Sequence, residues 1–273
     1  MKVHIEVPSA ECSGRLATVI PIRDRPALIS EAKDIALRYG LPFAQRGHRT
    51  RRRVVDDCGG WILMLRSDGL CFHSEGASYC FHPGSAHLRQ LMLNQGKQVH
   101  LLTALELQQD DSVLDCTLGQ ASDGQLIIAQ LGPKGSYVGL EQSAPIYWVV
   151  AEGLRRAALR WASAPRIEIQ HTDHLTYLRQ QADNSFDIVY FDPMFRSHIE
   201  ASTNMEDFLD IANHAPLTKE AFSEARRVAR RHVVIKERYY SEVFADLDIA
   251  HYPHHFVTPG KRTTSYAVID VRS

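Results

Sequence analysis

The feature that most restricts the fold of this chain is a regular alternation of short apolar runs and amphipathic stretches that begins at Ser112. Five runs have the length and composition of buried strands, and the stretches between them carry apolar residues at helical spacing. The predicted strands are Val113–Cys116, Tyr137–Glu141, Ile167–Gln170, Phe186–Phe191 and His232–Lys236. The predicted helices are Asp123–Leu131, Ala144–Trp161, Leu175–Gln181 and Lys219–Ala229. This alternation predicts an α/β fold, a doubly wound parallel sheet with helices on both faces.

Two further strands, Tyr252–Val257 and Ser265–Val271, follow with a Pro259-Gly260 turn between them. A connection this short cannot join parallel neighbours, so the last strand is predicted to run antiparallel. The 273 residues are 44% hydrophobic and 23% charged, which excludes disordered, collagen-like and coiled-coil chains. No apolar run approaches 18 residues, and the start lacks a signal-peptide core. We therefore expect a cytoplasmic protein without a membrane partner; its oligomeric state is not indicated.

The first 111 residues follow a different pattern. Residues 1–82 predict a small α+β module, residues 83–111 a helical bridge, and residues 112–273 the α/β domain. The helices expected in the first two segments are Arg25–Tyr39, ending at Gly40, and Ala86–Leu105. The strands expected in the module are Met1–Val7, Trp61–Leu65, Leu70–His73 and Ser78–His82, with a hairpin turn at Asp68-Gly69.

The first crossover of the alternating region has the features of a cofactor site, because open α/β sheets bind ligands beyond the carboxyl ends of their strands. Asp115 ends the first strand, and Gly119 lets the backbone approach a ligand before the helix that begins near Asp123. The turn lacks the GxGxxG pattern, and Asp115 would oppose a pyrophosphate, which argues against a nicotinamide oxidoreductase. A carboxylate here suits a cofactor with a cationic amino-acid portion, such as S-adenosylmethionine.

Two more acids follow the next two predicted strands. Glu141 can accept hydrogen bonds from both ribose hydroxyls of a nucleoside, and Asp173 is placed to accept from an adenine amino group. The alternative is structural, since acids often cap helices and Asp123 and Asp173 could be N-caps. Three acids in order at successive strand ends, together with Gly119, favour the cofactor site.

The predicted strand Phe186–Phe191 ends in the most specific motif of the chain, Asp192-Pro193-Met194-Phe195. Its continuous apolar run is typical of a strand buried on both faces, which places the motif beside the proposed cofactor. An arylamine is a poor nucleophile because its lone pair is delocalised. Asp192 and the Pro193 carbonyl can accept the amine hydrogens, and Phe195 can stack on the base, so that positioning assists methyl transfer. The alternative is an ordinary turn, with Phe195 in the core.

Together with Asp115-Cys116-Thr117-Leu118-Gly119 and Leu140-Glu141, this motif resembles the class I methyltransferases of the RsmJ-like group, and within it the YpiP-like bacterial branch. The resemblance covers most of the chain, including Phe81-His82-Pro83 and Arg89. It implies a seven-stranded Rossmann-like sheet, S-adenosylmethionine, and methylation of the guanine 2-amino group in small-subunit ribosomal RNA. The cofactor contacts it implies are Asp115, Thr117, Gly119, Ser122, Asp123, Glu141, Asp173 and Asp192. The chain departs from the group at Ala121-Ser122-Asp123, where the group has Gly-Arg-Asp.

A cluster of arginines in the module is the candidate RNA-binding surface. Residues 1–109 carry 14 Lys and Arg against 10 Asp and Glu, within a chain of net charge -1. The cluster consists of Arg46, Arg49, Arg51, Arg52 and Arg53. Such a cluster can neutralise several phosphates, and its alternative is a solvated loop that pairs with Asp56 and Asp57. For a second group, Arg226 to Arg231, a structural role near a helix C-terminus is favoured.

The five cysteines, at positions 12, 58, 71, 80 and 116, lack the spacing of a disulfide framework and are expected to be free thiols. Cys71, His73, Cys80 and His82 could hold zinc across a hairpin, but small apolar thiols in a half-buried hairpin are favoured and no metal is expected. Two alternatives to the ribosomal RNA enzyme remain open. One is methylation of another amine, in nucleic acid, protein or a small molecule; the other is a non-catalytic RNA-binding or assembly factor.

Overall fold

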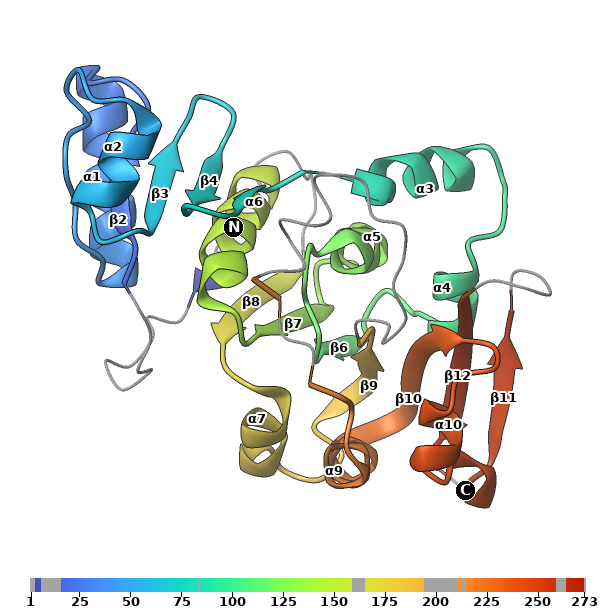
Figure 1. Cartoon of the computed structure of the whole chain (residues 1–273). Coiled ribbons are helices and arrows are strands. Elements are labelled where there is room, and N and C mark those ends of the chain that lie inside the picture. Colours follow the sequence, from blue (N-terminus) through green and yellow to red (C-terminus); the bar gives the residue numbers. More distant parts are fainter. Residues whose placement is uncertain are drawn as a thin grey trace.

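The alternating region folds into a large, mostly parallel sheet. The computed structural model describes residues 3–5, 16–82, 84–158, 165–193, 211–212, 215–258 and 264–272. The strand order of the large sheet is β1-β8-β7-β6-β9-β10-β12-β11 (Figure 1). Its strands are β1 Val3–Ile5, β6 Ser112–Asp115, β7 Ser136–Glu141, β8 Arg166–His171, β9 Phe186–Phe191, β10 Ala229–Arg238, β11 His254–Val257 and β12 Thr264–Asp270. The order reverses between β6 and β9, so the topological switch point lies there.

The end of the sheet confirms the predicted antiparallel finish. β12 lies between β10 and β11 and runs antiparallel to both, with Tyr266 opposite Lys236. Seven strands come from residues 112–270, as the Rossmann-like sheet requires. The eighth, β1, was expected in the N-terminal module. It instead pairs in parallel with β8, with Val3 opposite Ile167, because β8 would otherwise present an unpaired edge.

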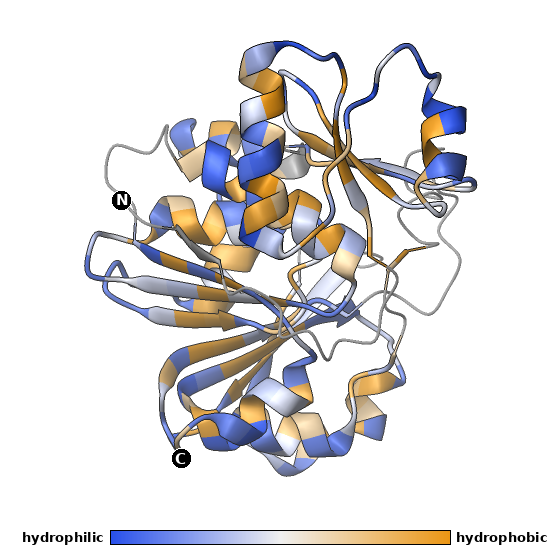
Figure 2. Ribbon diagram, turned by 90° about the vertical axis from the view of Figure 1, so that its left-hand side faces the viewer, coloured by the Kyte–Doolittle hydropathy of each residue, from blue (hydrophilic) through white to orange (hydrophobic). Residues whose placement is uncertain are grey.

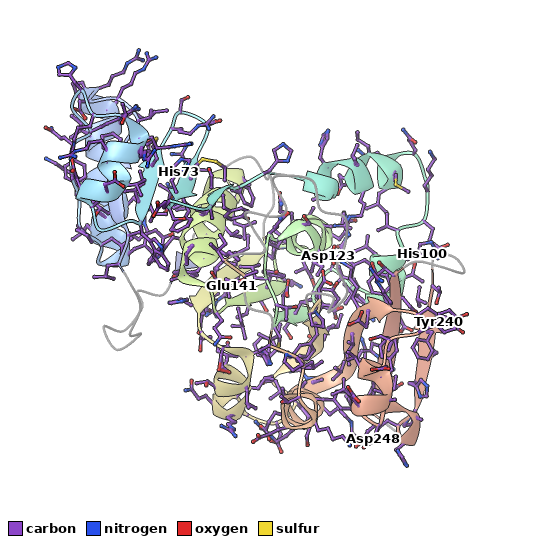
Figure 3. The ribbon with its side chains drawn as sticks, viewed as in Figure 1. His73, His100, Asp123, Glu141, Tyr240 and Asp248 are labelled. Carbon is purple, nitrogen blue, oxygen red and sulfur yellow. A yellow bond between two sulfur atoms is a disulfide. The ribbon has the colours of Figure 1, made fainter. Side chains whose placement is uncertain are left out.

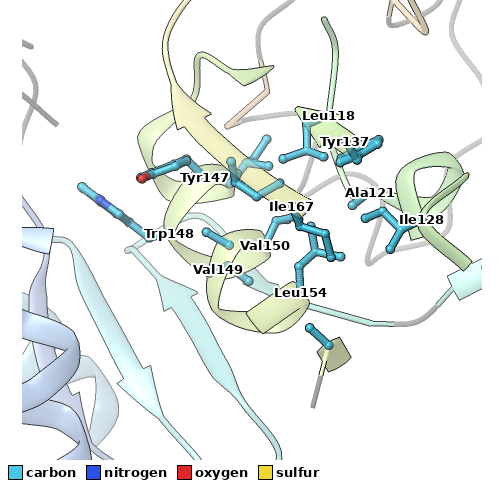
Figure 4. Packing of buried hydrophobic residues seen from close by; sticks show 14 of the residues in the cluster. Leu118, Ala121, Ile128, Tyr137, Tyr147, Trp148, Val149, Val150, Leu154 and Ile167 are labelled. Atoms are coloured by element: carbon cyan, nitrogen blue, oxygen red, sulfur yellow. The ribbon is translucent and has the colours of Figure 1, made fainter. Parts of the chain in front are cut away.

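Helices cover both faces of the large sheet, and each face has its own apolar cluster. The helical segments are α5 Ser122–Gln130, α6 Ala144–Ala158, α7 His174–Gln180, α9 Lys219–Val228, α10 Val243–Asp246 and the short 3-10 helix Ile249–His251. On one face, Val150 and Leu154 of α6 pack with Ile167 of β8 (Figure 4). On the other face, Leu178 of α7 and Phe222 of α9 pack against the strands. The helices keep a hydrophilic side toward solvent (Figure 2).

The N-terminal module has a four-stranded sheet of its own, in the order β2-β3-β4-β5. Its elements are β2 Thr18–Pro21, α1 Pro26–Tyr39, α2 Arg51–Asp57, β3 Ile62–Leu65, β4 Leu70–His73 and β5 Ser78–Cys80. Helix α1 ends at Gly40 in a left-handed conformation, as predicted. Sequence analysis missed β2 and α2. Each is too short for a clear period, and α2 begins because the Thr50 side chain accepts a hydrogen bond from the Arg53 amide.

The module packs against α6 through a buried carboxylate. Glu152 is fully buried on α6 and pairs with Arg38 of α1 at 2.5 Å. The Tyr39 hydroxyl donates to the same oxygen, and Arg155 pairs with the other. The Phe81 ring fills the space beside Gly153, where a Cβ would lie 2.1 Å from the ring. The helix predicted over 86–105 is two helices, α3 Gly84–Asn94 and α4 His100–Leu105, because Gly96 adopts a positive φ between them.

The prediction that all cysteines are free thiols is wrong for one pair. Cys71 and Cys80 face each other across the β4–β5 hairpin with their Cα atoms 4.3 Å apart, and they form a disulfide. The hairpin register decides this, because directly opposed residues of an antiparallel pair bring their side chains together. Cys58 and Cys116 are free. Within the described ranges, no His, Cys, Asp and Glu side chains group as metal ligands, and none of the helices combines the length and apolar character needed to cross a membrane.

Candidate active site

The carboxyl ends of three neighbouring strands meet at the switch point of the large sheet. Asp115 closes β6, Glu141 closes β7, and Asp192 follows β9 directly. Asp115 lies in register with Tyr190 of β9, so the ends of these two strands are side by side. Figure 3 marks Glu141, at the end of β7, and Asp123, in α5. The acids selected from the sequence are therefore brought to one edge.

Asp115 is a buried carboxylate held by two donors. It accepts hydrogen bonds from the Tyr137 hydroxyl at 2.6 Å and from the Thr117 amide at 3.1 Å. Burial raises the pKa of Asp115 to about 7, although both hydrogen bonds act in the opposite direction. Gly124 of α5 leaves room for this arrangement, because a Cβ there would lie 2.3 Å from the Tyr137 hydroxyl. A cation beside Asp115 would stabilise its ionised form.

The turn after β6 is tied to Glu141. The Gly119 amide donates to Oε2 of Glu141 at 3.0 Å, and the Ser143 amide donates to Oε1 at 2.7 Å. Gly119 and Ala121 both have positive φ, and Ala121 occupies the place where the RsmJ-like group has glycine. Burial raises the pKa of Glu141 to about 7. Its carboxylate is held in one orientation and keeps lone pairs for further donors.

Two buried polar atoms beside Glu141 lack hydrogen-bond partners among the described residues: Ser143 Oγ and His171 Nδ1. His171 ends β8 and is the register partner of Glu141. An adenosine carries two ribose hydroxyls and an adenine amine, so its polar groups match this carboxylate, hydroxyl and imidazole. With Asp115 available for a cationic amino group, the residues at this edge fit S-adenosylmethionine.

Asp173 occupies the structural position that sequence analysis left open. It is the N-cap of α7, and its carboxylate accepts from the Thr176 amide at 2.9 Å and from the Thr176 hydroxyl at 3.1 Å. Its contact with an adenine amine stays a prediction.

Asp192 marks the corner where the substrate is expected. Its amide donates to the Thr117 hydroxyl at 2.5 Å, which joins the corner to the turn after β6. Its Oδ2 accepts from the Lys236 ammonium at 2.6 Å. Burial raises the pKa of Asp192 to about 6 even though Lys236 acts to lower it. Pro193 is half-buried beside it, while the predicted stacking residue Phe195 lies outside the described residues.

Asp123 is not an N-cap; it lies in the first turn of α5 and binds three side chains. Oδ1 accepts from Arg89 at 2.5 Å, and Oδ2 accepts from the Tyr190 hydroxyl at 2.5 Å and from Lys236 at 2.9 Å. Burial acts to raise the pKa of Asp123, but Lys236 and Arg89 hold it well below its usual range. Arg89 also donates to the Ser122 carbonyl at 2.9 Å, so α3 is tied to the start of α5.

Sequence analysis assigned no role to Lys236 or Tyr190, and it listed Arg89 only within the resemblance. A signal was present for Lys236: it is the first charged residue after the apolar run from Val233 to Ile235. A lysine at the carboxyl end of a buried strand needs a partner, and the nearest strand end carries Asp192. The partnership with Asp123 could not be read from the sequence, because the two residues are 113 positions apart.

The arginine cluster of the module divides into bound and exposed members. Arg46 donates to the Ile22 and Arg49 carbonyls, while Arg49 and Arg53 pair with Asp57. Arg51 and Arg52 are exposed on α2 and form no ion pair with any carboxylate in the described part of the chain. The prediction of a basic surface therefore rests on these two side chains.

The second arginine group has the structural role that sequence analysis favoured. Arg227 pairs with Glu224 and Asp183, Arg230 with Asp187, and Arg231 with Asp111. Arg226 lies over the Tyr252 ring, 3.6 Å from its centroid.

Comparison with known proteins identifies the family. A family model described as "Putative SAM-dependent methyltransferase" matches residues 72–258. Uncharacterized protein YpiP of Bacillus subtilis is 31% identical over 226 residues, which cover 79% of this chain and 86% of that protein. Ribosomal RNA small subunit methyltransferase J of Psychrobacter cryohalolentis is 31% identical over 181 residues, or 62% of this chain and 60% of that protein. Its namesake from Hahella chejuensis is 31% identical over 129 residues, or 46% of this chain and 47% of that protein.

A solved structure has the same fold. The SAM-dependent methyltransferase NGO1261 from Neisseria gonorrhoeae superposes with a TM-score of 0.59 at 17% identity, covering 94% of this chain and 97% of that one. The predicted resemblance, Rossmann-like sheet and cofactor are thereby confirmed. The family match spans the carboxyl edge with Asp115, Glu141 and Asp192, and the chain belongs to a family of SAM-dependent methyltransferases.

Proposed function

We propose that this enzyme methylates an exocyclic amine of a base in small-subunit ribosomal RNA, in the cytoplasm, with the guanine 2-amino group as the expected acceptor. The observation that carries the proposal is the Asp192 carboxylate beside the cofactor edge. Lys236 binds its Oδ2, and the substrate amine is proposed to bind at Oδ1, which accepts from none of the described residues. The relatives named ribosomal RNA small subunit methyltransferase J support RNA as the substrate class, although the chain spans about half to three fifths of their length.

Within this proposal the residues that would hold the cofactor lie at the carboxyl ends of β6 and β7. Glu141 would accept the ribose hydroxyls, the backbone at Gly119 would allow the ligand to approach closely, and Asp115 would bind the cationic amino group. When bound, S-adenosylmethionine supplies an electrophilic methyl group. The charge of Asp123 is already balanced by two cations of the protein, so its part is to hold Lys236 and Arg89 at the site.

The part of Asp192 is to bind and orient the substrate amine. Oδ1 of Asp192 and the Pro193 carbonyl accept the amine hydrogens, which turns the nitrogen lone pair toward the methyl carbon. When the amine is methylated its nitrogen would release one proton, and the Asp192 carboxylate that holds the amine would be the group placed to accept that proton. Holding the two groups in this orientation is the main contribution to rate that the protein can make.

The module would bring RNA to the site. Arg51 and Arg52 are free to neutralise phosphates, and each phosphate neutralised increases the salt dependence of binding. Replacing both arginines with alanine should weaken binding of ribosomal RNA and reduce the slope of log affinity against log salt by about 2. Replacing Arg227 and Arg230, which are paired within the fold, should leave the slope unchanged. Equal slopes for the two double variants would remove α2 from the RNA surface.

The function is tested by mapping modified nucleosides in ribosomal RNA from cells with and without the gene. We expect one methylated base to disappear from small-subunit RNA and to return with the wild-type gene. Asp192→Asn should not restore it, although the purified variant should still bind S-adenosylmethionine in calorimetry. An unchanged modification map, with methyl transfer to a protein or small molecule instead, would refute ribosomal RNA as the substrate.

A further inference from the structure

We infer that Lys236 makes this site selective for a neutral amine, because it supplies the positive charge that Asp192 would otherwise take from a substrate. The inference rests on the proposed function, since it takes Asp192 as the group that receives the substrate amine. It adds a restriction on substrate class: arylamines such as the exocyclic amines of bases are accepted, and alkylammonium groups such as lysine side chains or polyamines are rejected.

The geometry places Lys236 between two carboxylates from different elements. Its Nζ lies 2.6 Å from Oδ2 of Asp192 and 2.9 Å from Oδ2 of Asp123. Arg89 of α3 binds the opposite oxygen of Asp123 at 2.5 Å. Only 18% of the Lys236 side chain and 7% of the Asp123 side chain are exposed. Two cations and two carboxylates thus alternate in one series of contacts, from Arg89 in the helical bridge through Asp123 and Lys236 to Asp192.

The charges of these four side chains sum to zero before any ligand binds, so none of their carboxylates is left unpaired for a cationic substrate. An alkylammonium at Asp192 would lie near the Lys236 ammonium. At a separation of about 6 Å and an effective dielectric constant of about 20, repulsion between two unit charges weakens binding about a hundredfold. The sulfonium of a bound cofactor would add a further positive charge near this corner. A neutral amine avoids this repulsion and still donates its hydrogens to Oδ1 of Asp192.

A lysine with only a structural role could pair with Asp123 alone, because Asp123 is more deeply buried than Asp192 and also binds Arg89. Lys236 instead makes its shorter contact with Asp192, the residue proposed to bind the substrate amine. The Lys236 ammonium therefore lies beside the carboxylate proposed to bind the amine, where its charge lowers the affinity for a cationic amine. That charge can be measured without RNA, because S-adenosylmethionine carries a sulfonium cation and S-adenosylhomocysteine carries a neutral thioether at the same position.

The experiment compares the affinities of S-adenosylmethionine and S-adenosylhomocysteine by calorimetry. Lys236→Met removes the ammonium and its repulsion toward a neighbouring cation, so at a pH high enough to ionise Asp192 the ratio of the two association constants should rise at least about tenfold in favour of the sulfonium. Lys236→Arg keeps the charge and should leave the ratio within about threefold of wild type. The double variant Lys236→Met, Asp192→Asn removes one charge of each sign and should return the ratio toward the wild-type value.

A second measurement addresses the substrate directly. n-Butylammonium and aniline are tested as inhibitors of ribosomal RNA methylation, and Lys236→Met should be inhibited by the cation at least about tenfold more strongly than wild type, with aniline unchanged. Thermal unfolding checks that each variant is folded, and Lys236→Gln replaces Lys236→Met if the latter is not. An unchanged ratio of cofactor affinities in a folded variant would overturn the inference. Failure of the wild type to methylate ribosomal RNA would instead overturn the proposed function.

Discussion

The free energy of unfolding of this protein should decrease as the pH rises from about 5 to about 8. Replacing Asp115 with asparagine should abolish a large part of that decrease. The carboxyl group is 2% exposed, and burial raises its pKa from 3.8 to about 7. In this pH range the native carboxyl group keeps a proton that the unfolded chain has already released. The free energy of unfolding therefore falls as the pH rises, until the native group also ionises near pH 7.

The size of the effect follows from the interval between pH 5 and the folded pKa. Each pH unit in which Asp115 is protonated only in the native state changes the free energy of unfolding by about 1.4 kcal/mol. Asp115 therefore accounts for about 2.5 kcal/mol of the decrease in that free energy between pH 5 and pH 8. Asparagine does not titrate. Its weaker acceptance of the Tyr137 and Thr117 hydrogen bonds lowers the free energy of unfolding by the same amount at both pH values. This amount cancels when the change in that free energy with pH is compared between the two proteins.

Denaturant unfolding at pH 5 and pH 8 measures the two free energies for each protein. Between pH 5 and pH 8 the free energy of unfolding should decrease more in the wild type than in the variant. Glu141, with a pKa of about 7, titrates in both proteins, while Asp115 titrates only in the wild type. Asp68→Asn is the matched control, since that carboxylate lies exposed in the β3–β4 turn beside Arg66. Identical slopes for wild type and Asp115→Asn would refute the argument that burial keeps this carboxyl protonated.

Three further predictions concern the same architecture. Gly124→Ala should lower the affinity for S-adenosylmethionine about tenfold in calorimetry, because the new Cβ displaces the Tyr137 hydroxyl from Asp115; an affinity within twofold of wild type would contradict this. Gly153→Ala gains about 1 kcal/mol of helix propensity but drives a methyl group into Phe81 at a cost of up to about 3 kcal/mol, so denaturant unfolding should show a net loss of 1–2 kcal/mol, and a gain would argue against this packing. S-adenosylmethionine at a hundred times its dissociation constant should stabilise the protein by about 2.7 kcal/mol in thermal unfolding, whereas NAD should have no effect.

The architecture of the α/β domain was predictable because it follows from local periodicity. Runs such as Phe186–Phe191 are apolar throughout and bounded by turns, so their strand character does not depend on distant residues. Once the strands are parallel and joined by helices, their carboxyl ends must share one edge. That rule predicts from the sequence alone that Asp115, Glu141 and Asp192 lie close together. Short elements such as α2 escaped the same reasoning because seven residues do not establish a period.

The motif at the end of β9 predicts the substrate corner, and it lies within the residues 72–258 that the family model matches. The partners of its residues were decided by the tertiary structure. Asp123, expected to contact the cofactor, is bound on both oxygens by Arg89, Tyr190 and Lys236. Asp173 was predicted to bind adenine, and its carboxylate caps α7. An acid at a strand end can accept from many donors, and only the fold determines which donor is nearest.

The sequence by itself determined the type of sheet, the order of its acids along one edge and the class of cofactor, because each depends on residues close together in the chain. The tertiary structure alone decided that β1 joins the large sheet, that Cys71 meets Cys80, and that Lys236 lies between Asp123 and Asp192. These are contacts set by register and packing across the fold. The charge at Asp192 depends on the last of these contacts, because the protonation of a buried carboxylate is set by the cation that the fold places beside it.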